Sequence, residues 1–412
     1  MFSVSSAVPS AVPSAVPSTV PSSSSSPSSP SSVHSQRDLN KHLLMMRACF
    51  LLSDVEMLRP FTESMFDQLE AGRWKWGNDI TVHLRRSMQK RLHGVTGTTS
   101  TSAAWASAFD IERWSASLDA PLAATVSTLT SPSKGSTPEF NKIGALDGLR
   151  LNFSAPWPLS IVLDAPALER YNRIMRLLLQ VKRCKFMLDK THMTLHRRLL
   201  ELQKNGCGTR WLARDVDLKH NAHSAGLLLM ELMHFVNHFH AYLMDRAVRI
   251  EWDHLRADLD TIHASASSSL ASSRIVSVDA LRKRHYMFLD NVSDQCLLHP
   301  RSRVALQQVQ KILDCCLQVA GCVVTFMDLA PQRISWTGER KESSAAPENA
   351  RLAKVLRRVG VLKHSFRRTN RFLIVLIQSH IRHAKGAAGF LESILTAVDF
   401  TGFYSKRGTL LD

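Results

Sequence analysis

The chain has 412 residues, of which 44% are hydrophobic, and this apolar content is sufficient for one large globular core or two ordinary cores. It contains only 17 glycines, 16 prolines and 4 tyrosines, while leucine, arginine, alanine and methionine are plentiful, and this balance favours helices over a sheet protein with many tight turns. Lysine and arginine outnumber aspartate and glutamate by 52 to 35, and the net charge of +17 predicts an acidic partner, namely nucleic acid, anionic lipid or an acidic protein.

The cysteines and the N-terminus indicate the compartment. Seven cysteines, an odd number without the spacing of a disulfide framework, are typical of a reducing environment. No continuous run reaches the roughly 18 to 20 apolar residues that a membrane span needs, so we expect no membrane segment. No lysine or arginine precedes Arg37, which argues against secretory and mitochondrial import signals. We therefore predict a cytoplasmic protein.

Residues 1–36 consist almost entirely of serine, proline, alanine and valine, and Pro9, Pro13, Pro17 and Pro21 recur at every fourth position. Such a segment buries too little apolar surface to form a core, so we predict that it is disordered. Residues 37–412 are predicted to form a helical domain with flexible insertions near 94–145, 264–275 and 331–350, where small polar or charged residues accumulate.

Apolar residues at helical spacing predict most of the remaining elements. Residues 42–69 indicate a helical hairpin in which Ser53 and Asp54 break the pattern and can cap the second helix. The segment 149–163 contains two prolines and should be extended, because proline lacks an amide donor and restricts the residue before it. Together the predicted helices form an elongated all-α bundle; they cover residues 80–92, 166–196, 225–250, 278–298, 303–329, 354–383 and 390–398.

The sequence contains two histidine pairs but no complete catalytic or metal-binding pattern. His192 with His196 and His234 with His238 have the i, i+4 spacing that can present two metal ligands, but neither pair has an identified third ligand or a zinc-protease motif. No phosphate-binding glycine loop, nucleophile elbow or dinucleotide fingerprint is present. We therefore expect no metal, no cofactor and no enzymatic activity.

Positive charge is concentrated near the C-terminus. Between residues 331 and 385 there are 13 lysines or arginines and 3 glutamates, a net charge of 13 − 3 = +10. This region can be a solvated helix face or a surface for an acidic partner. It lacks interleaved stacking aromatics and any standard nucleic-acid module, so nucleic acid is the less favoured partner.

Several separated segments resemble the gamma-tubulin complex component family, in the family's own order. The turn Pro156-Trp157-Pro158-Leu159 resembles its Trp-Pro-Leu hallmark, and Tyr171-Asn172 followed by residues 177–183 resembles the helix directly downstream. Details around His285 and Cys296 are similar to component five. The likeness also covers residues 47–58, 233–237, 284–298 and 398–404, and it extends from about residue 38 to residue 408.

This resemblance implies the C-terminal, gamma-tubulin-binding domain of a helical scaffold. The implied partners are gamma-tubulin and other complex components, at a microtubule-organising centre such as the centrosome or spindle pole. The alternative is a basic helical protein that binds nucleic acid or serves as a general interaction scaffold. Trp157 and Tyr171 are either partner contacts or core residues, because aromatic side chains serve both roles. The candidate partner-binding residues are Trp157, Tyr171, Arg173, Arg176, Arg183, Arg367, Arg368 and Arg371.

Overall fold

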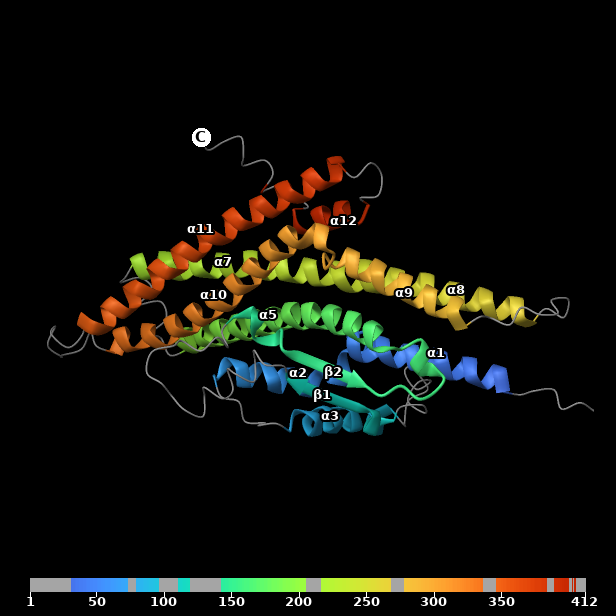
Figure 1. The fold of residues 1–412 in the computed structure, drawn as a ribbon. Coiled ribbons are helices and arrows are strands. Elements are labelled where there is room, and N and C mark those ends of the chain that lie inside the picture. Colours follow the sequence, from blue (N-terminus) through green and yellow to red (C-terminus); the bar gives the residue numbers. More distant parts are fainter. Residues whose placement is uncertain are drawn as a thin grey trace, which may run out of the picture.

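The computed structural model describes residues 31–72, 79–95, 110–118, 142–204, 216–267, 278–335, 346–383 and 389–399, together with Gly402 and Tyr404. Helices dominate these ranges (Figure 1). The α-helices are α1 (Ser31–Phe50), α2 (Val55–Glu70), α3 (Ile80–Val95), α5 (Ala165–Lys204), α7 (Val216–Ala241), α8 (Glu251–Ser267), α9 (Val278–Gln295), α10 (Arg303–Ser335), α11 (Ala346–His383) and α12 (Gly389–Val398). The other elements are strands β1 (Trp114–Leu118) and β2 (Leu149–Phe153), a π-helical stretch η7 (Tyr242–Ile250) that joins α7 to α8, and the short 3-10 turns η3 (Ile111–Arg113), η5 (Ile143–Leu146), η6 (Leu159–Ile161) and η8 (Pro300–Ser302).

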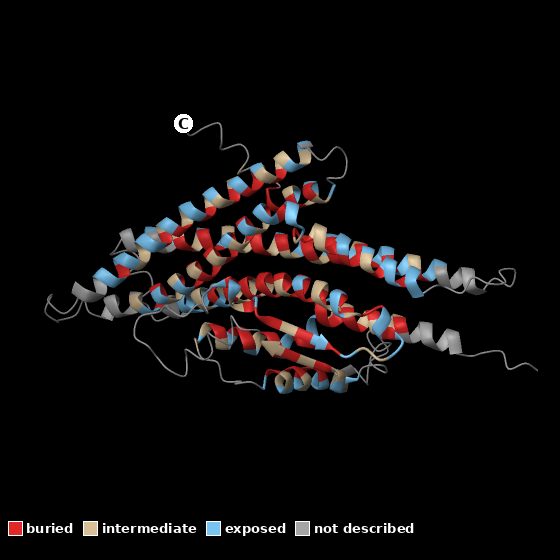
Figure 2. Ribbon diagram, in the orientation of Figure 1, coloured by how far each residue is buried: buried red, intermediate tan, exposed pale blue. Residues whose placement is uncertain are grey.

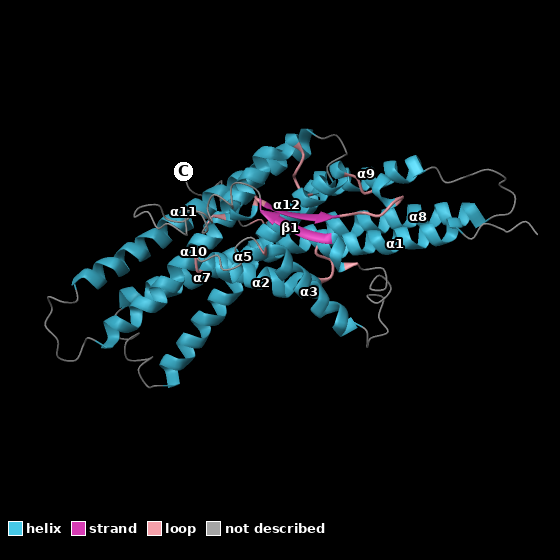
Figure 3. Ribbon diagram, turned by 60° about the horizontal axis from the view of Figure 1, so that its bottom comes forward, coloured by secondary structure: helices cyan, strands magenta, loops and turns pink. Residues whose placement is uncertain are grey.

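The long helices lie side by side in an elongated body (Figure 1). Helix α10 packs against α5 and α11, and α7 also contacts all three of these helices. On the other side of α5 lie α1, α2, α3 and the β1–β2 hairpin, which is visible between the helices in the turned view of Figure 3. Buried residues, coloured red in Figure 2, follow the inward side of every long helix and form one continuous hydrophobic core.

The hairpin is held at both of its outer edges by side chains. Strands β1 and β2 pair antiparallel, with Trp114 opposite Phe153. On the β1 side, the hydroxyl of Thr81 donates to the Ala116 carbonyl at 3.0 Å and accepts from the Ala116 amide at 3.1 Å. On the β2 side, Asn172 Oδ1 accepts from the Leu151 amide at 2.8 Å, and Nδ2 donates to the Leu151 carbonyl at 2.9 Å. These bonds satisfy backbone groups that an edge strand would otherwise leave open.

The structure confirms the predicted all-α class and the positions of its long helices. Asp54 caps α2, since its carboxylate accepts from the Glu56 amide at 3.1 Å. Residues 149–153 are extended as predicted, but the prediction of an extended segment up to residue 163 is wrong for Leu159–Ile161, which form the 3-10 turn η6.

Several predicted boundaries differ from the structure. The flexible insertion near 94–145 is wrong for residues 110–118 and 142–145, which form β1 and two 3-10 turns, because Trp114 is completely buried and anchors the segment. Helix α1 begins at Ser31, inside the segment predicted to be disordered. Helix α8 extends to Ser267, and α10 and α11 extend into the predicted 331–350 insertion. The rest of these ranges lies outside the described residues.

One helical stretch in the described ranges, Val278–Leu329, is long and apolar enough to cross a membrane by length and composition, and 56% of its most apolar window is buried in the protein. The sequence analysis predicts no membrane span because it requires a continuous run of apolar residues, which is a stricter test than length and composition. Core helices pass the same test of length and composition, and α10 packs against both α5 and α11.

Candidate functional site

The eight predicted partner-binding residues lie in three different places. Tyr171 and Arg183 are in the core, whereas Arg367, Arg368 and Arg371 are on α11. The third place is the N-terminal half of α5 together with the turn before it: Trp157 lies in the turn that precedes η6, and Arg173 and Arg176 lie on α5 at a pocket. The structure therefore does not bring the eight residues together into one site.

Tyr171 is a core residue, so it cannot contact a docked partner. Its hydroxyl lies 2.9 Å from Nε2 of His285, and its ring centroid is 5.3 Å from that of Phe50. Burial raises the pKa of Tyr171 and lowers the pKa of His285 to about 4, so both groups are neutral near pH 7. The prediction that Tyr171 binds a partner directly does not fit this burial.

Arg183 is also a core residue, with only 2% of its surface exposed. Its Nη1 donates to the Lys142 carbonyl at 3.1 Å, and the burial of the guanidinium lowers its pKa. On the same short turn, the Ile143 amide donates to Asp314 at 2.7 Å. Arg183 thus ties α5 to the start of η5 inside the protein. The prediction that Arg183 contacts a partner directly does not fit this burial.

Trp157 is 83% exposed, so the alternative that it is a core residue is wrong. The turn that carries it is fixed from beneath, because Leu159, Val162 and Leu163 are buried. The Leu163 amide also donates to the Leu159 carbonyl at 2.9 Å. A large aromatic side chain on an anchored turn loses little conformational freedom on binding, which is the property of a good interface anchor.

An exposed edge of α5 leads to a pocket. Pro166, Glu169 and Arg173 have i, i+3 and i+7 spacing, which places them on one line of the helix, and all three reach solvent. Arg150 of β2 pairs with Glu169 at 3.2 Å. This edge of α5 therefore presents charged groups, and the exposed Trp157 precedes the helix in the chain.

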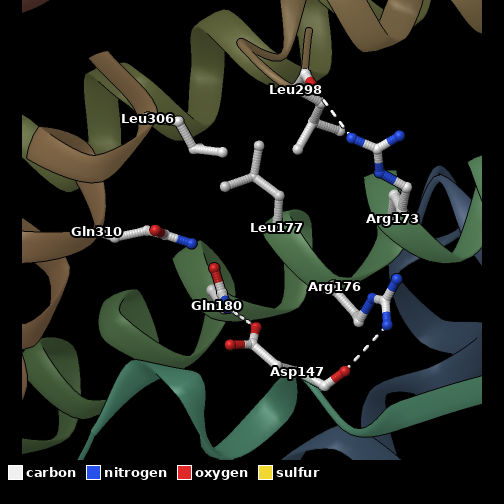
Figure 4. Close-up of a pocket in the computed structure, with 8 residues that line it drawn as sticks. All are labelled: Asp147, Arg173, Arg176, Leu177, Gln180, Leu298, Leu306 and Gln310. Carbon is white, nitrogen blue, oxygen red and sulfur yellow. Dashed lines mark hydrogen bonds between the residues drawn. The ribbon is translucent and has the colours of Figure 1, made fainter. Parts of the chain in front are cut away.

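The pocket has a volume of about 240 Å³ and lies between α5, α10, η5 and the loop after α9 (Figure 4). Arg173 Nη2 donates to the Leu298 carbonyl at 2.9 Å, and Arg176 Nη1 donates to the Asp147 carbonyl at 2.9 Å. Its lining residues are Asp147, Arg173, Arg176, Leu177, Gln180, Leu298, Leu306 and Gln310.

The two arginines of the pocket differ in their hydrogen-bond partners and in their exposure. Arg176 is committed internally, because Nη2 also pairs with Glu169 at 3.0 Å. Gln180 donates to Asp147 at 2.6 Å, and burial raises the pKa of that carboxyl group. Arg173 is exposed, so its guanidinium is the group best placed to meet a carboxylate from outside.

Among the described residues the pocket has no nucleophile paired with a base, and no group of three His, Cys, Asp or Glu residues there could hold a metal ion. The His234 and His238 rings lie 4.2 Å apart on α7, and burial together with the neighbouring His238 lowers the pKa of His234.

The three arginines on α11 differ in their surroundings. Nε of Arg367 donates to Glu231 of α7 at 3.1 Å, so this side chain joins α11 to α7. Arg371 is partly buried, and Arg368 is exposed. Arg368 is thus the member of this group that is most accessible to a partner.

The sequence prediction missed the structural roles of two residues within the motifs it quoted, Asn172 and His285. It also missed Asp147, Gln180 and Gln310 of the pocket. Only the fold brings these side chains together, and no local spacing in the sequence would have indicated their contacts.

These features define a helical body with an exposed tryptophan and exposed arginines on its surface. The family model described as gamma tubulin complex component C-terminal matches residues 39–404, and the chain belongs to this family. It is 26% identical over 297 residues to gamma-tubulin complex component 5 of Mus musculus, with 68% of this chain and 24% of that protein covered.

Two further relatives agree with this family. For gamma-tubulin complex component 5 of Macaca fascicularis the identity is 26% over 297 residues, covering 68% of this chain and 34% of that protein. Spindle pole body component alp4 of Schizosaccharomyces pombe is 23% identical over 184 residues, covering 45% of this chain and 20% of that protein. The resemblance to component five seen in the sequence is thus confirmed, and the chain spans about a quarter to a third of the length of the two component 5 relatives.

Proposed function

We propose that the chain binds gamma-tubulin as a non-catalytic scaffold subunit of a gamma-tubulin complex and contributes to microtubule nucleation. The observation that carries this proposal is the family match over residues 39–404, which includes most of the helical body. The names of the relatives, gamma-tubulin complex components and a spindle pole body component, support a location in the cytoplasm at a microtubule-organising centre. Other complex components are the second class of partner.

The proposed contact surface for gamma-tubulin is the exposed edge of α5 together with the Trp157 turn. Trp157 supplies a large anchor, and Arg173 supplies a charged group beside a pocket. Tryptophan and arginine carry a large share of the binding energy in protein interfaces. The net charge of +17 favours encounter with an acidic protein and lowers the chance of pairing with a basic one.

A scaffold that orients its partner must also be rigid beneath the contact. Helix α5 has 40 residues and is joined to three other elements by buried polar side chains. Tyr171 meets α9, Asn172 meets β2 and Arg183 meets the residue before η5. Such fixed packing lets a binding surface keep one orientation.

The test is size-exclusion chromatography with light scattering on the full chain mixed with purified gamma-tubulin at moderate salt. The proposal predicts co-elution with the mass of a one-to-one complex. Separate elution of two folded proteins would contradict it. Nuclease-treated samples should still co-elute, because a bridging nucleic acid would be removed by that treatment.

A further inference from the structure

Helix α11 carries a strongly basic outer face. Its sequence from Arg351 to His383 contains nine lysines or arginines and no aspartate or glutamate. Arg367 and Lys363 turn toward α7, where they meet Glu231 and Ser224. Lys354, Arg357, Arg358 and Arg368 remain exposed, so the face away from the core is positively charged.

Apolar residues are exposed on the same face. Val361 is 60% exposed, Phe372 48% and Val375 54%. Figure 2 shows the pale blue, exposed side of α11 facing away from the rest of the helices. An exposed phenylalanine and two valines beside arginines on one helix are more than a solvated face needs, and apolar groups in such a setting mark interaction surfaces.

The exposed residues follow a heptad spacing. Lys354, Val361, Arg368 and Val375 are separated by seven positions each. A second row at Arg358, Ser365, Phe372 and Ser379 has the same interval and lies beside the first. Both rows are suited to contact with one straight partner helix, which would run for about 38 Å along the 26 positions from Lys354 to Ser379.

The positive charge on this face determines which kind of partner can bind to it. A second copy of the chain would place two arginine-rich faces against each other, which is unfavourable. A bilayer fits poorly, because Arg368 lies between Val361 and Phe372 and interrupts the apolar stripe. A helix with an apolar stripe flanked by glutamate or aspartate would match both the apolar residues and the arginines.

We propose that the outer face of α11 is a docking surface for an acidic amphipathic helix of a partner protein. This surface lies on α11 and not on α5, so it is separate from the α5 edge, and it does not depend on gamma-tubulin binding. Lys354 and Arg368 meet the partner's carboxylates, while Val361, Phe372 and Val375 pack against its apolar stripe; Arg358 donates to Gln318 of α10 at 2.6 Å.

The test uses the full chain and a fluorescein-labelled synthetic peptide of four heptads, with isoleucine and leucine at the a and d positions and glutamate at e and g. Fluorescence anisotropy should show saturable binding that weakens as salt increases, because charge pairs at an exposed surface are screened. The matched peptide with lysine at e and g should not bind.

Two variants on α11 give the decisive comparison. Arg368→Glu and Phe372→Glu should each weaken peptide binding by at least about tenfold. Met287→Glu is the control, because Met287 on α9 is also 48% exposed and lies away from this face. Lys354→Glu provides a further variant if either substitution alters the circular dichroism spectrum.

Unchanged peptide binding by both α11 variants would overturn the proposal. So would the absence of peptide binding to the folded wild-type chain. Phosphatidylcholine–phosphatidylserine vesicles and a DNA duplex are tested in parallel, and preferential binding of either, lost in the same variants, would assign the face to a membrane or to nucleic acid instead.

Discussion

The hydroxyl of Tyr171 and Nε2 of His285 lie 2.9 Å apart in the core, although 114 positions separate the two residues in the sequence. This contact joins α5 to α9, and the His285 ring also stacks near Phe288 with a centroid distance of 6.5 Å. Both partners are neutral, so the bond needs no compensating charge. It fixes the half of α5 that carries the proposed gamma-tubulin contact.

The substitution Tyr171→Phe should destabilise the fold by about 1 to 3 kcal/mol, because it removes one partner of a buried polar pair and leaves the imidazole nitrogen unsatisfied. Urea denaturation followed by circular dichroism measures the change. The double variant Tyr171→Phe with His285→Phe should show a smaller loss than the sum of the two single variants. Strict additivity would mean that the two groups do not interact.

The stability of the chain should fall on acidification between about pH 6.5 and pH 4. Burial lowers the pKa of His285, and that of His240, to about 4, whereas an unfolded histidine titrates near about 6.5. The unfolded state therefore binds more protons than the folded state in this pH window. The contribution of the two neutral histidines to the free energy of unfolding is complete above about pH 6.5 and is lost as the pH falls.

Each of these histidines should account for about 1 to 2 kcal/mol of lost stability at pH 5. Urea midpoints measured across this range test the prediction. The urea midpoint of the His285→Phe variant should change less with pH than that of the wild type. Both proteins contain the same buried carboxyl groups, so the titration of those groups contributes equally to both curves. Parallel curves would show that His285 does not titrate as proposed.

Asn172→Ala should destabilise the hairpin locally. The Asn172 side chain makes two hydrogen bonds to Leu151 of β2 and a third to the Leu168 carbonyl at 3.0 Å. Its removal leaves buried backbone groups open and should cost about 2 to 4 kcal/mol. Hydrogen exchange at the Leu151 amide should accelerate more than exchange in α10, and equal acceleration in both would indicate a general loss of stability instead.

Trp157→Ala should weaken gamma-tubulin binding by at least about tenfold and leave the urea midpoint unchanged, because the ring is exposed and fills no cavity in the chain. Met193→Ala is a matched control, since Met193 is an exposed apolar residue farther along α5. Biolayer interferometry with immobilised gamma-tubulin gives both affinities. Equal affinities for the two variants would remove Trp157 from the contact.

Arg173→Glu should weaken the same complex and should do so more strongly at low salt, because the introduced carboxylate repels an acidic partner. Arg176→Ala should instead lower stability, since Arg176 bonds to Asp147 and Glu169 within the protein. If Arg173→Glu leaves the affinity unchanged and Arg176→Ala lowers the affinity without a loss of stability, then Arg176 contacts the partner and Arg173 does not.

The helices could be predicted from the sequence because each long helix repeats its apolar residues over many turns. The break at Asp54 was visible for a similar reason, since an N-cap is a local signal. The hairpin was missed because β1 has five residues and its partner strand lies beyond a long polar segment. A strand this short shows too few alternations to establish a period of two.

The site was less predictable than the fold. The family motifs drew attention to Trp157 and Tyr171, but the sequence could not show that the first is exposed and the second buried. Whether a side chain is buried depends on the orientation of its turn or helix in the fold, and contacts with residues distant in the sequence determine that orientation. The same reason explains Arg183, an arginine whose carbonyl partner is supplied by Lys142.

Hydrogen–deuterium exchange of the full chain, with and without purified gamma-tubulin, shows directly whether the proposed surface binds gamma-tubulin. We expect protection on complex formation in residues 155–176, which contain the Trp157 turn and the exposed edge of α5, with little change on the outer face of α11. Protection confined to α11 or α12 would contradict the proposed contact. The absence of protection anywhere, in a sample with saturating gamma-tubulin, would contradict binding itself.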